Sequence, residues 1–397
     1  MKAFVLGAGG QGGPCASILA RDKEVTEVVL GDINPDAAAR VAEKIGGGKI
    51  KTVKADAAKA DEIAACARGA DVLFDMVIPE FSPHVLRAAL DIGAHYVSTA
   101  FDQPFWEELI YGRPLTLDKE LKEANLTAVM GCGMAPGFIN VITKHYTDRL
   151  DTVESVKLRI AKKKLGVEEM LAPWNPGWSP RQALLDCAEP AYFVENGKIT
   201  ETAPYSGLEV YDFPPPIGPA QVTHHAHEEP LTLAYSIGKG LQYCDFKYYL
   251  SPQPAAYVTA GLASTAPVRI GGAEIRPIDL LVKLLPKSEN AFLNEDPDRY
   301  VQADKEQFVC LMSEIRGTRN GRDKTYKIHM PKLTANGGKL RELFGTSLIH
   351  VALPAVIAAK MALAGTKKGL VFPEELDAAD FLKRFLDTGI PYEWHEM

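Results

Sequence analysis

The chain has 397 residues, more than one hydrophobic core usually serves, so two or three domains are expected. Hydrophobic residues make up 46% and charged residues 24%, which excludes disordered, collagen-like and coiled-coil proteins. The 44 basic and 51 acidic residues give a net charge of −7, which argues against binding to nucleic acid or a membrane surface and favours a small-molecule substrate.

The first 135 residues alternate short β-branched segments with longer alanine-rich ones, the pattern of βαβ units around a parallel sheet. The predicted strands are Lys2–Leu6, Glu27–Leu30, Lys51–Val53, Val72–Val77, His95–Ser98 and Thr127–Val129. The predicted helices are Gln11–Ala20, Pro35–Ile45, Ala58–Ala67, Ser82–Ile92 and Leu117–Ala124. This order predicts a Rossmann-type, doubly wound α/β domain over residues 1–135.

The remaining chain changes character after one more helix, which starts at Pro136. Apolar residues recur there every four positions, at Phe138, Ile142, Tyr146 and Leu150. Alternating segments such as Val153–Ile160 and Lys324–Met330 then predict a second α+β domain, residues 136–340, with a mainly antiparallel sheet, where substrate binding and catalysis are expected. Residues 341–397 turn helical again, at Gly345–Leu363 and Glu375–Leu386. The pattern leaves open whether they extend the second domain or cover the first.

The sequence indicates a cytoplasmic protein without a membrane segment. The apolar start Ala3–Leu6 is too short for a signal peptide, and Pro354 and Lys360 interrupt the most apolar later stretch, Ile349–Leu363. The six cysteines form no C-x-x-C pair, so neither a disulfide framework nor a cysteine metal site is expected.

A glycine-rich turn follows the first strand and opens the first helix. Its sequence Gly7-Ala8-Gly9-Gly10-Gln11-Gly12 is a G-x-G-x-x-G. Gly7 allows a tight turn, Gly9 allows close approach of a pyrophosphate, and Gly12 lets the helix pack near the strand. Asp32 ends the second strand, where a carboxylate accepts ribose hydroxyls, so the turn predicts a dinucleotide site.

Asp32 also bears on the choice of cofactor. A carboxylate there repels a 2′-phosphate, and Ile33-Asn34-Pro35 supplies no arginine to receive one, so NAD is expected rather than NADP. Asp56 and Val77-Ile78-Pro79 follow later strands at the carboxyl edge of the sheet and are further candidate cofactor contacts. The alternative is that they are ordinary loop residues.

Several segments resemble the saccharopine dehydrogenase family, which includes saccharopine reductases, lysine 6-dehydrogenases and carboxynorspermidine dehydrogenases. They are the glycine-rich turn and the segments Ala94-His95-Tyr96-Val97-Ser98-Thr99-Ala100-Phe101, Gly133-Met134-Ala135-Pro136-Gly137-Phe138-Ile139-Asn140, His227-Glu228-Glu229-Pro230-Leu231-Thr232-Leu233 and Lys368-Gly369-Leu370-Val371-Phe372-Pro373-Glu374-Glu375-Leu376-Asp377. The resemblance covers nearly the whole chain. It implies hydride transfer between nicotinamide and the carbon of a C–N bond, a homodimer, and a final segment that returns to the nucleotide domain.

Two positions depart from the saccharopine reductase pattern. The turn reads Ala135-Pro136-Gly137 where those enzymes have D-P-G, and this version is closer to the lysine 6-dehydrogenase branch. A serine-tyrosine pair near the nicotinamide is replaced by Thr99-Ala100-Phe101-Asp102. Asp102 is therefore a candidate for proton transfer.

The segment His224-His225-Ala226-His227-Glu228-Glu229 concentrates imidazoles and carboxylates. Histidine transfers protons near neutral pH, and a carboxylate can fix its tautomer or hold a substrate ammonium. If the segment is extended, His225, His227 and Glu229 face one side and are candidate catalytic residues. A zinc site and a polar loop without chemistry are the alternatives, and no metal is expected.

An amino-acid substrate needs a cation for its carboxylate. Arg181 and Lys247 lie among aromatic residues of the second domain and are the candidates, with a surface charge as the alternative for each. Cys132 ends a predicted strand and is expected to be a packed thiol rather than a nucleophile.

The leading hypothesis is an NAD-dependent dehydrogenase acting on lysine or a lysine adduct such as saccharopine. The second is a dehydrogenase for a carboxylated polyamine, such as carboxynorspermidine, or another amino acid. A third hypothesis, from another class, is a non-catalytic NAD(H)-binding sensor.

Overall fold

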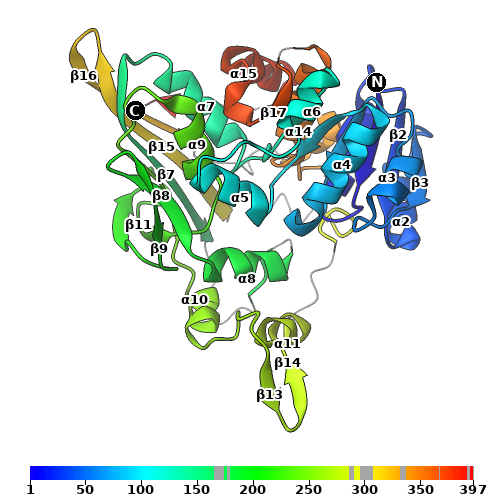
Figure 1. The fold of residues 1–397 in the computed structure, drawn as a ribbon, viewed down its shortest axis with the longest axis horizontal. Helices are drawn as coiled ribbons and strands as arrows, with labels where there is room; N and C mark the ends of the chain where they lie inside the picture. Colours follow the sequence, from blue (N-terminus) through cyan, green and yellow to red (C-terminus); the bar gives the residue numbers. More distant parts are fainter. Residues whose placement is uncertain are drawn as a thin grey trace.

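The glycine-rich turn lies at the carboxyl end of an interior strand of a seven-stranded parallel sheet, seen on the right of Figure 1. The computed structural model describes residues 1–164, 174–176, 179–285, 290–295, 307–330, 337–365, 367–390 and 394–396. The strand order is β17-β6-β5-β4-β1-β2-β3. The strands are β1 (Lys2–Leu6), β2 (Glu27–Asp32), β3 (Ile50–Lys54), β4 (Val72–Asp75), β5 (His95–Ser98), β6 (Thr127–Val129) and β17 (Gly369–Val371).

Helices cover both faces of this sheet, as a doubly wound fold requires. They are α1 (Gly12–Arg21), α2 (Pro35–Ile45), α3 (Ala60–Cys66), α4 (Ser82–Ile92), α5 (Gln103–Ile110) and α6 (Asp118–Glu123), with the 3-10 turn η1 (Pro79–Phe81) before α4. The predicted Rossmann-type fold is confirmed, and the six predicted strands agree with the observed ones to within two residues at each end. Helix α5 was not predicted, although Pro104 in its first turn is a start signal.

A second sheet of nine strands, on the left of Figure 1, confirms the predicted mainly antiparallel second region. Its main path is β10-β11-β12-β7-β15-β16-β18, with β8 and β9 joined through β12. Among the described strands of this sheet, only β12 and β7 pair in parallel. The strands are β7 (Thr152–Lys164), β8 (Ala191–Glu195), β9 (Lys198–Thr202), β10 (Glu209–Asp212), β11 (Pro219–His224), β12 (Tyr243–Tyr249), β15 (Gln307–Arg319), β16 (Arg322–Met330) and β18 (His395–Glu396).

The helices of this region are α7 (Phe138–Thr147), α8 (Pro180–Ala188), α9 (Glu229–Ile237), α10 (Pro252–Thr259) and α11 (Pro277–Leu284). Helix α11 and the hairpin β13 (Val268–Ile270) and β14 (Ala273–Ile275) project from the lower side of Figure 1. Helices α7 and α9 pack on the apolar face of the second sheet, where Val156, Leu158 and Ile315 are fully buried. The core is continuous from the first sheet to the second through this cluster.

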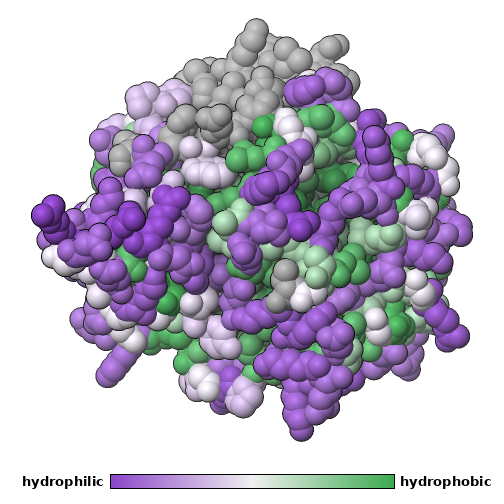
Figure 2. All heavy atoms as spheres, turned by 90° about the horizontal axis from the view of Figure 1, so that it is seen from above, coloured by the Kyte–Doolittle hydropathy of each residue, from purple (hydrophilic) through white to green (hydrophobic). Residues whose placement is uncertain are grey.

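The last part of the chain returns to the first sheet, because β17 pairs in parallel with β6. It also contains α13 (Gly337–Phe344), α14 (Ala352–Leu363), the 3-10 turn η2 (Pro373–Glu375) and α15 (Ala378–Asp387). Helix α14 is apolar around most of its circumference and packs against α1 and β5, so it is buried on the sheet. Within the described ranges, no helix combines the length and hydropathy needed to span a bilayer. Hydrophilic residues cover most of the coloured surface on the face seen in Figure 2.

Candidate active site

The glycine turn has the geometry that a dinucleotide pyrophosphate needs. Gly7 adopts φ +99°, and a Cβ on Gly12 would lie 1.7 Å from the carbonyl oxygen of Gly7. Gly9 and Gly10 instead border open space, since nothing lies within 4 Å of a Cβ placed there. Gln11 directly precedes α1, whose first turn contains no acidic residue. The turn therefore leaves room for an anion at the helix N-terminus.

Asp32 holds this turn from the end of β2. Its Oδ2 accepts a hydrogen bond from the Ala8 N–H at 2.7 Å, and its Oδ1 accepts one from the Asn34 N–H at 2.8 Å. Ile33, the next residue, is 63% exposed. The predicted ribose-binding carboxylate thus lies directly beside the predicted pyrophosphate turn.

The other predicted cofactor contacts lie at the same carboxyl edge of the sheet. Asp56 follows β3 and accepts a hydrogen bond from the Ala58 N–H at 3.0 Å. Val77, Ile78 and Pro79 lead from β4 into η1, and the Val77 N–H donates to Asp75 at 3.3 Å.

Two acidic groups at this edge have raised pKa values. Burial raises the pKa of Asp75 to about 6, although the Tyr96 hydroxyl donates to it at 2.7 Å. Burial and the charge of Asp75 raise the pKa of Asp102 to about 6. In the part of the chain that the structure describes, the buried Oδ1 of Asp102 has no hydrogen-bond partner. Asp102 can therefore exchange a proton close to neutral pH.

The histidine segment is not one extended strand, which corrects the sequence interpretation. Strand β11 ends at His224, and Glu229 begins α9 with Pro230 at the next position. The predicted groups nevertheless meet, because His227 Nδ1 lies 2.7 Å from Glu229 Oε2 and 3.8 Å from Glu228 Oε2. The helix start, rather than strand alternation, brings Glu229 to the imidazole.

Aromatic rings of β12 support the two imidazoles. His227 stacks on Phe246 with ring centroids 4.1 Å apart, and His225 stacks on Tyr248 at 5.3 Å. The centroids of the His225 and His227 rings are 5.7 Å apart. Both imidazoles are thus held against the sheet.

The surroundings separate the pKa values of the two histidines. Burial alone would lower the pKa of His227, but Glu229, Glu228 and Asp186 raise it to about 9. Burial and the neighbouring His227 charge lower the pKa of His225 to about 3. At neutral pH these shifts favour the protonated form of His227 and the neutral form of His225.

The carboxylates of this cluster are also perturbed. Burial raises the pKa of Glu228 and of Asp186 to about 7. The Glu229 side chain is fully buried, and its Oε1 has no hydrogen-bond partner among the described residues. His227, Glu228 and Glu229 each offer an atom within 4.8 Å of the others, so they could also hold a metal ion.

Lys247 and Arg181 already have acidic partners. Lys247 is only 5% exposed, so its interpretation as a surface charge is wrong, and it donates to Glu209 at 2.9 Å and to the Gly207 carbonyl at 2.6 Å. Arg181 forms an ion pair with Asp279.

Cys132 is a packed thiol, as expected. It is fully buried and its Sγ lies 3.5 Å from the Pro354 carbonyl oxygen. Burial raises the pKa of its thiol, so it is not an activated nucleophile.

Arg159 is a fully buried cation that the sequence analysis missed. Its guanidinium binds Asp245 through two hydrogen bonds, at 2.7 and 3.0 Å, and contacts Glu209 at 2.5 Å. Asp245 and Lys247 point to the face of β12 opposite Phe246 and Tyr248, because strand side chains alternate. The alternation Asp245-Phe246-Lys247-Tyr248 was the available signal for this charged layer.

Asn140 and Glu374 form a second buried polar group outside the prediction. Asn140 Nδ2 donates to Thr232 Oγ1 at 3.0 Å and to Glu374 Oε1 at 3.3 Å, while its Oδ1 accepts from the Gly137 N–H. Burial raises the pKa of Glu374 to about 7. This group fixes α9 relative to the turn after β6.

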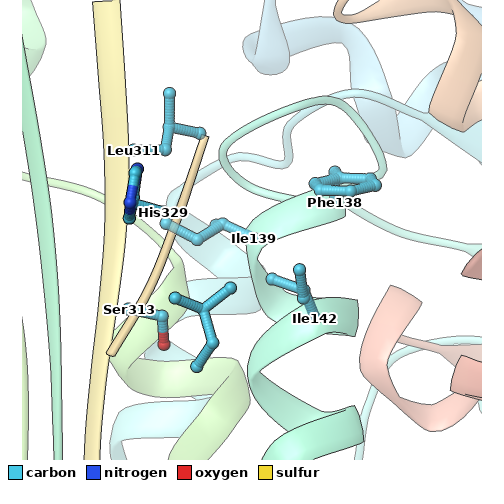
Figure 3. Close-up of a pocket in the computed structure, with 7 residues that line it drawn as sticks. Phe138, Ile139, Ile142, Leu311, Ser313 and His329 are labelled. Atoms are coloured by element: carbon cyan, nitrogen blue, oxygen red, sulfur yellow. The ribbon is translucent and has the colours of Figure 1, made fainter. Parts of the chain in front are cut away.

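A small cavity lies between α7 and the β15–β16 pair (Figure 3). Its volume is about 10 Å³, and it is lined by Phe138, Ile139, Ile142, Leu311, Ser313, Ile328 and His329. That space suits a single water molecule and not a substrate.

The fold and the glycine turn define a dinucleotide-binding protein, and comparison with known proteins specifies the family. Residues 3–129 match the profile of the saccharopine dehydrogenase NADP binding domain, and residues 133–390 match that of the saccharopine dehydrogenase C-terminal domain. The chain belongs to the saccharopine dehydrogenase family and is an NAD(P)-dependent dehydrogenase.

Relatives match over the whole chain. Carboxyaminopropylagmatine dehydrogenase from Synechocystis sp. is 24% identical, covering 100% of this chain and 97% of the relative. Carboxynorspermidine synthase from Vibrio alginolyticus is 21% identical, covering 100% and 96%. The saccharopine dehydrogenase (L-Glu forming) structure from Saccharomyces cerevisiae aligns with a TM-score of 0.69 at 16% identity, covering 100% and 99%.

Proposed function

We propose that this enzyme oxidises or forms the C–N bond of a carboxylated polyamine, with NAD as the preferred cofactor. The second hypothesis of the sequence analysis thereby moves ahead of the first. The observation that carries the proposal is the buried acidic cluster of Asp186, Glu228 and Glu229 around His227.

This cluster suits a polycation. Burial raises the pKa of Glu228 and of Asp186 to about 7, although the neighbouring His227 charge acts to lower both values. A bound ammonium group would compensate that negative charge and lower both pKa values. The buried cations Arg159 and Lys247 are held by carboxylates on the other face of the sheet.

Two relatives that match over the full chain support the same substrate class, since the name of each refers to a carboxylated polyamine. Residues 1–135, with 341–397 returning to them, would then bind the cofactor. Residues 136–340 would bind the amine.

The chemistry assigns His227 a defined role. A bound dinucleotide, held by the glycine turn and Asp32, would supply the acceptor for the hydride that leaves the carbon of the C–N bond. The nitrogen loses its proton to a base, the C–N bond becomes C=N, and added water gives an aldehyde and a free amine. His227, held by Glu229, donates the proton in the reductive direction at neutral pH and accepts it in the oxidative direction above its pKa of about 9. Asp102 and His225 are the further candidates for proton transfer.

The preference for NAD rests on Asp32. Its carboxylate is already held by two backbone N–H groups, so it stays at the ribose position and repels a 2′-phosphate. In Asp32→Ala, the ratio of NAD to NADP affinity should fall by about tenfold or more. An unchanged ratio would remove Asp32 from cofactor selection.

The substrate is tested by absorbance at 340 nm with NAD⁺ at mildly alkaline pH. Carboxynorspermidine, carboxyaminopropylagmatine, saccharopine and lysine are presented separately. A rise with either carboxylated polyamine alone supports the proposal. A rise with saccharopine or lysine alone rejects it in favour of the lysine hypothesis, and NADH binding without any rise favours the sensor.

A second measurement tests the acidic cluster without turnover. Binding of a polyamine should release protons from Glu228 and Asp186, because their pKa values fall. Calorimetric titration with norspermidine at pH 7, in buffers of different ionisation enthalpy, measures this release. Binding without proton release would contradict the assigned cluster.

A further inference from the structure

A short segment of the second region lies directly against the glycine turn. It comprises residues 290–295, between α11 and β15 in the sequence. The Asn290 Nδ2 donates a hydrogen bond to the Ala8 carbonyl oxygen at 2.8 Å. On its other side, the Ala8 N–H donates to Asp32 at 2.7 Å. Ala8 is therefore held from both directions.

The bond from Asn290 acts on the peptide group that carries the N–H of Gly9. The carbonyl of Ala8 and this N–H belong to one planar peptide unit, so fixing the oxygen also fixes the direction of the N–H. Gly9 borders the open space at the N-terminus of α1. Backbone N–H groups at this place are the donors that a G-x-G-x-x-G turn offers to a pyrophosphate.

Asn290 is itself fixed by its neighbours. Its Oδ1 accepts from the N–H groups of Phe292 and Leu293 at 3.1 and 3.2 Å. Phe292 is 1% exposed, and its ring packs directly on Gly13. A Cβ added to Gly13 would lie only 2.6 Å from the Phe292 ring. The Lys44 ammonium donates to the Phe292 and Leu293 carbonyls and lies 5.0 Å from the Phe292 ring.

The end of the segment is fixed as well. The Glu295 carboxylate accepts from the N–H and the hydroxyl of Ser347, both at 2.7 Å, and from the Thr346 hydroxyl at 2.8 Å. It also pairs with Arg341 at 3.0 Å. These bonds fix residues 290–295 against the residues that lead into α14.

We propose that Asn290 is a positioning residue for the cofactor: it orients the pyrophosphate-binding turn and links dinucleotide binding to the second region. Such linkage is reciprocal, so the cofactor stabilises the position of residues 290–295 and their displacement weakens cofactor binding. The inference rests on the dinucleotide binding that the proposed function also requires.

Cofactor affinity tests the inference without any substrate. NADH is titrated into wild-type protein and Asn290→Ala, and the fluorescence of the bound nucleotide is measured. Loss of one orienting hydrogen bond should raise the Kd about tenfold. Gln242→Ala is the control, since Gln242 is an exposed amide outside residues 290–295 whose Nε2 donates to the Gly240 carbonyl at 2.8 Å. It should bind NADH like the wild type.

A second variant covers the case in which Asn290→Ala does not fold. Lys44→Met removes the bonds to the carbonyls of Phe292 and Leu293 and leaves Asn290 in place. It should also raise the Kd for NADH, by about two- to fivefold. If Asn290→Ala folds and binds NADH as tightly as the wild type, the inference is overturned. If Asn290→Ala does not fold, wild-type NADH affinity in Lys44→Met overturns it.

Hydrogen exchange provides a readout that distinguishes positioning from general stability. Saturating NADH should slow amide exchange in residues 290–295 of the wild type, and this protection should be lost in Asn290→Ala. Equal protection in both proteins would contradict the linkage. If the wild type binds neither NADH nor NADPH, the proposed function fails too, whereas normal wild-type binding with an unaffected variant rejects only the role of Asn290.

Discussion

Replacing Glu229 by glutamine should make His227 a weaker base. Neighbouring carboxylates raise the pKa of His227 from 6.5 to about 9, which corresponds to about 3 kcal/mol in favour of the imidazolium. Among these carboxylates Glu229 raises the pKa most, and its Oε2 lies 2.7 Å from His227 Nδ1. Because Glu229→Gln removes the charge but keeps an amide oxygen of the same shape, the pKa of His227 should fall by about one to two pH units.

Two assays follow this change. Titration of the His227 imidazole by NMR reports the pKa directly in the substrate-free protein, and the pH dependence of kcat/KM shows whether the same group controls the reaction. Glu228→Gln is the matched control. The Glu228 Oε2 lies 3.8 Å from His227 Nδ1, so the pKa of His227 should fall less in Glu228→Gln than in Glu229→Gln. An imidazole titration that is the same in Glu229→Gln and in the wild type would refute the reasoning.

The same shift predicts how stability depends on pH. The folded-state pKa of His227 lies above its unfolded value of 6.5, so its stabilising contribution is fully present below pH 6.5 and is lost as the pH rises through about 9. The free energy of unfolding is measured in urea at pH 6.5 and at pH 9.5. Its decrease between these pH values should be about 3 kcal/mol smaller in His227→Gln than in the wild type. An identical dependence in both proteins would mean that the imidazolium is not stabilised by folding.

Two further substitutions test the fold around the site. Gly12→Ala should abolish NADH binding, because its Cβ would lie 1.7 Å from the Gly7 carbonyl oxygen. Gly338→Ala is the control, since a Cβ there meets open space and should leave NADH binding unchanged. A fluorescence titration with NADH compares the two variants. Arg159→Met should lower the free energy of unfolding by about 3 to 5 kcal/mol, since Asp245 stays buried without its partner. Arg384→Met removes an exposed helical pair and should lower it by less than about 1 kcal/mol in the same urea titration.

Local signals in the sequence predicted the nucleotide-binding part well. The glycine turn, helix α1 and strand β2 with Asp32 follow one another closely in the sequence. Each is specified by short-range patterns of apolar residues, glycine and proline. The same patterns could have identified α5 and α9, each of which has a proline in its first turn.

Contacts between distant residues could not be predicted in this way. Asn290 meets Ala8 across 282 positions, and Glu374 meets Asn140 across 234 positions. Neither asparagine stands out by type, because their roles arise from packing in three dimensions. The burial of Lys247 likewise depends on Glu209, which reaches it through the pairing of β10, β11 and β12.

The pairing of β17 with β6 has a consequence for synthesis on the ribosome. Residues 369–371 complete the edge of the first sheet, and the Thr127 hydroxyl donates to the Lys367 carbonyl beside them. Until residues 369–371 have emerged, β6 keeps an unpaired edge, which is a template for pairing with other chains. The strands of the nucleotide-binding sheet thus come from both sides of the second region in the sequence, so a chain truncated before residue 369 should be prone to aggregation even though β1 to β6 are intact.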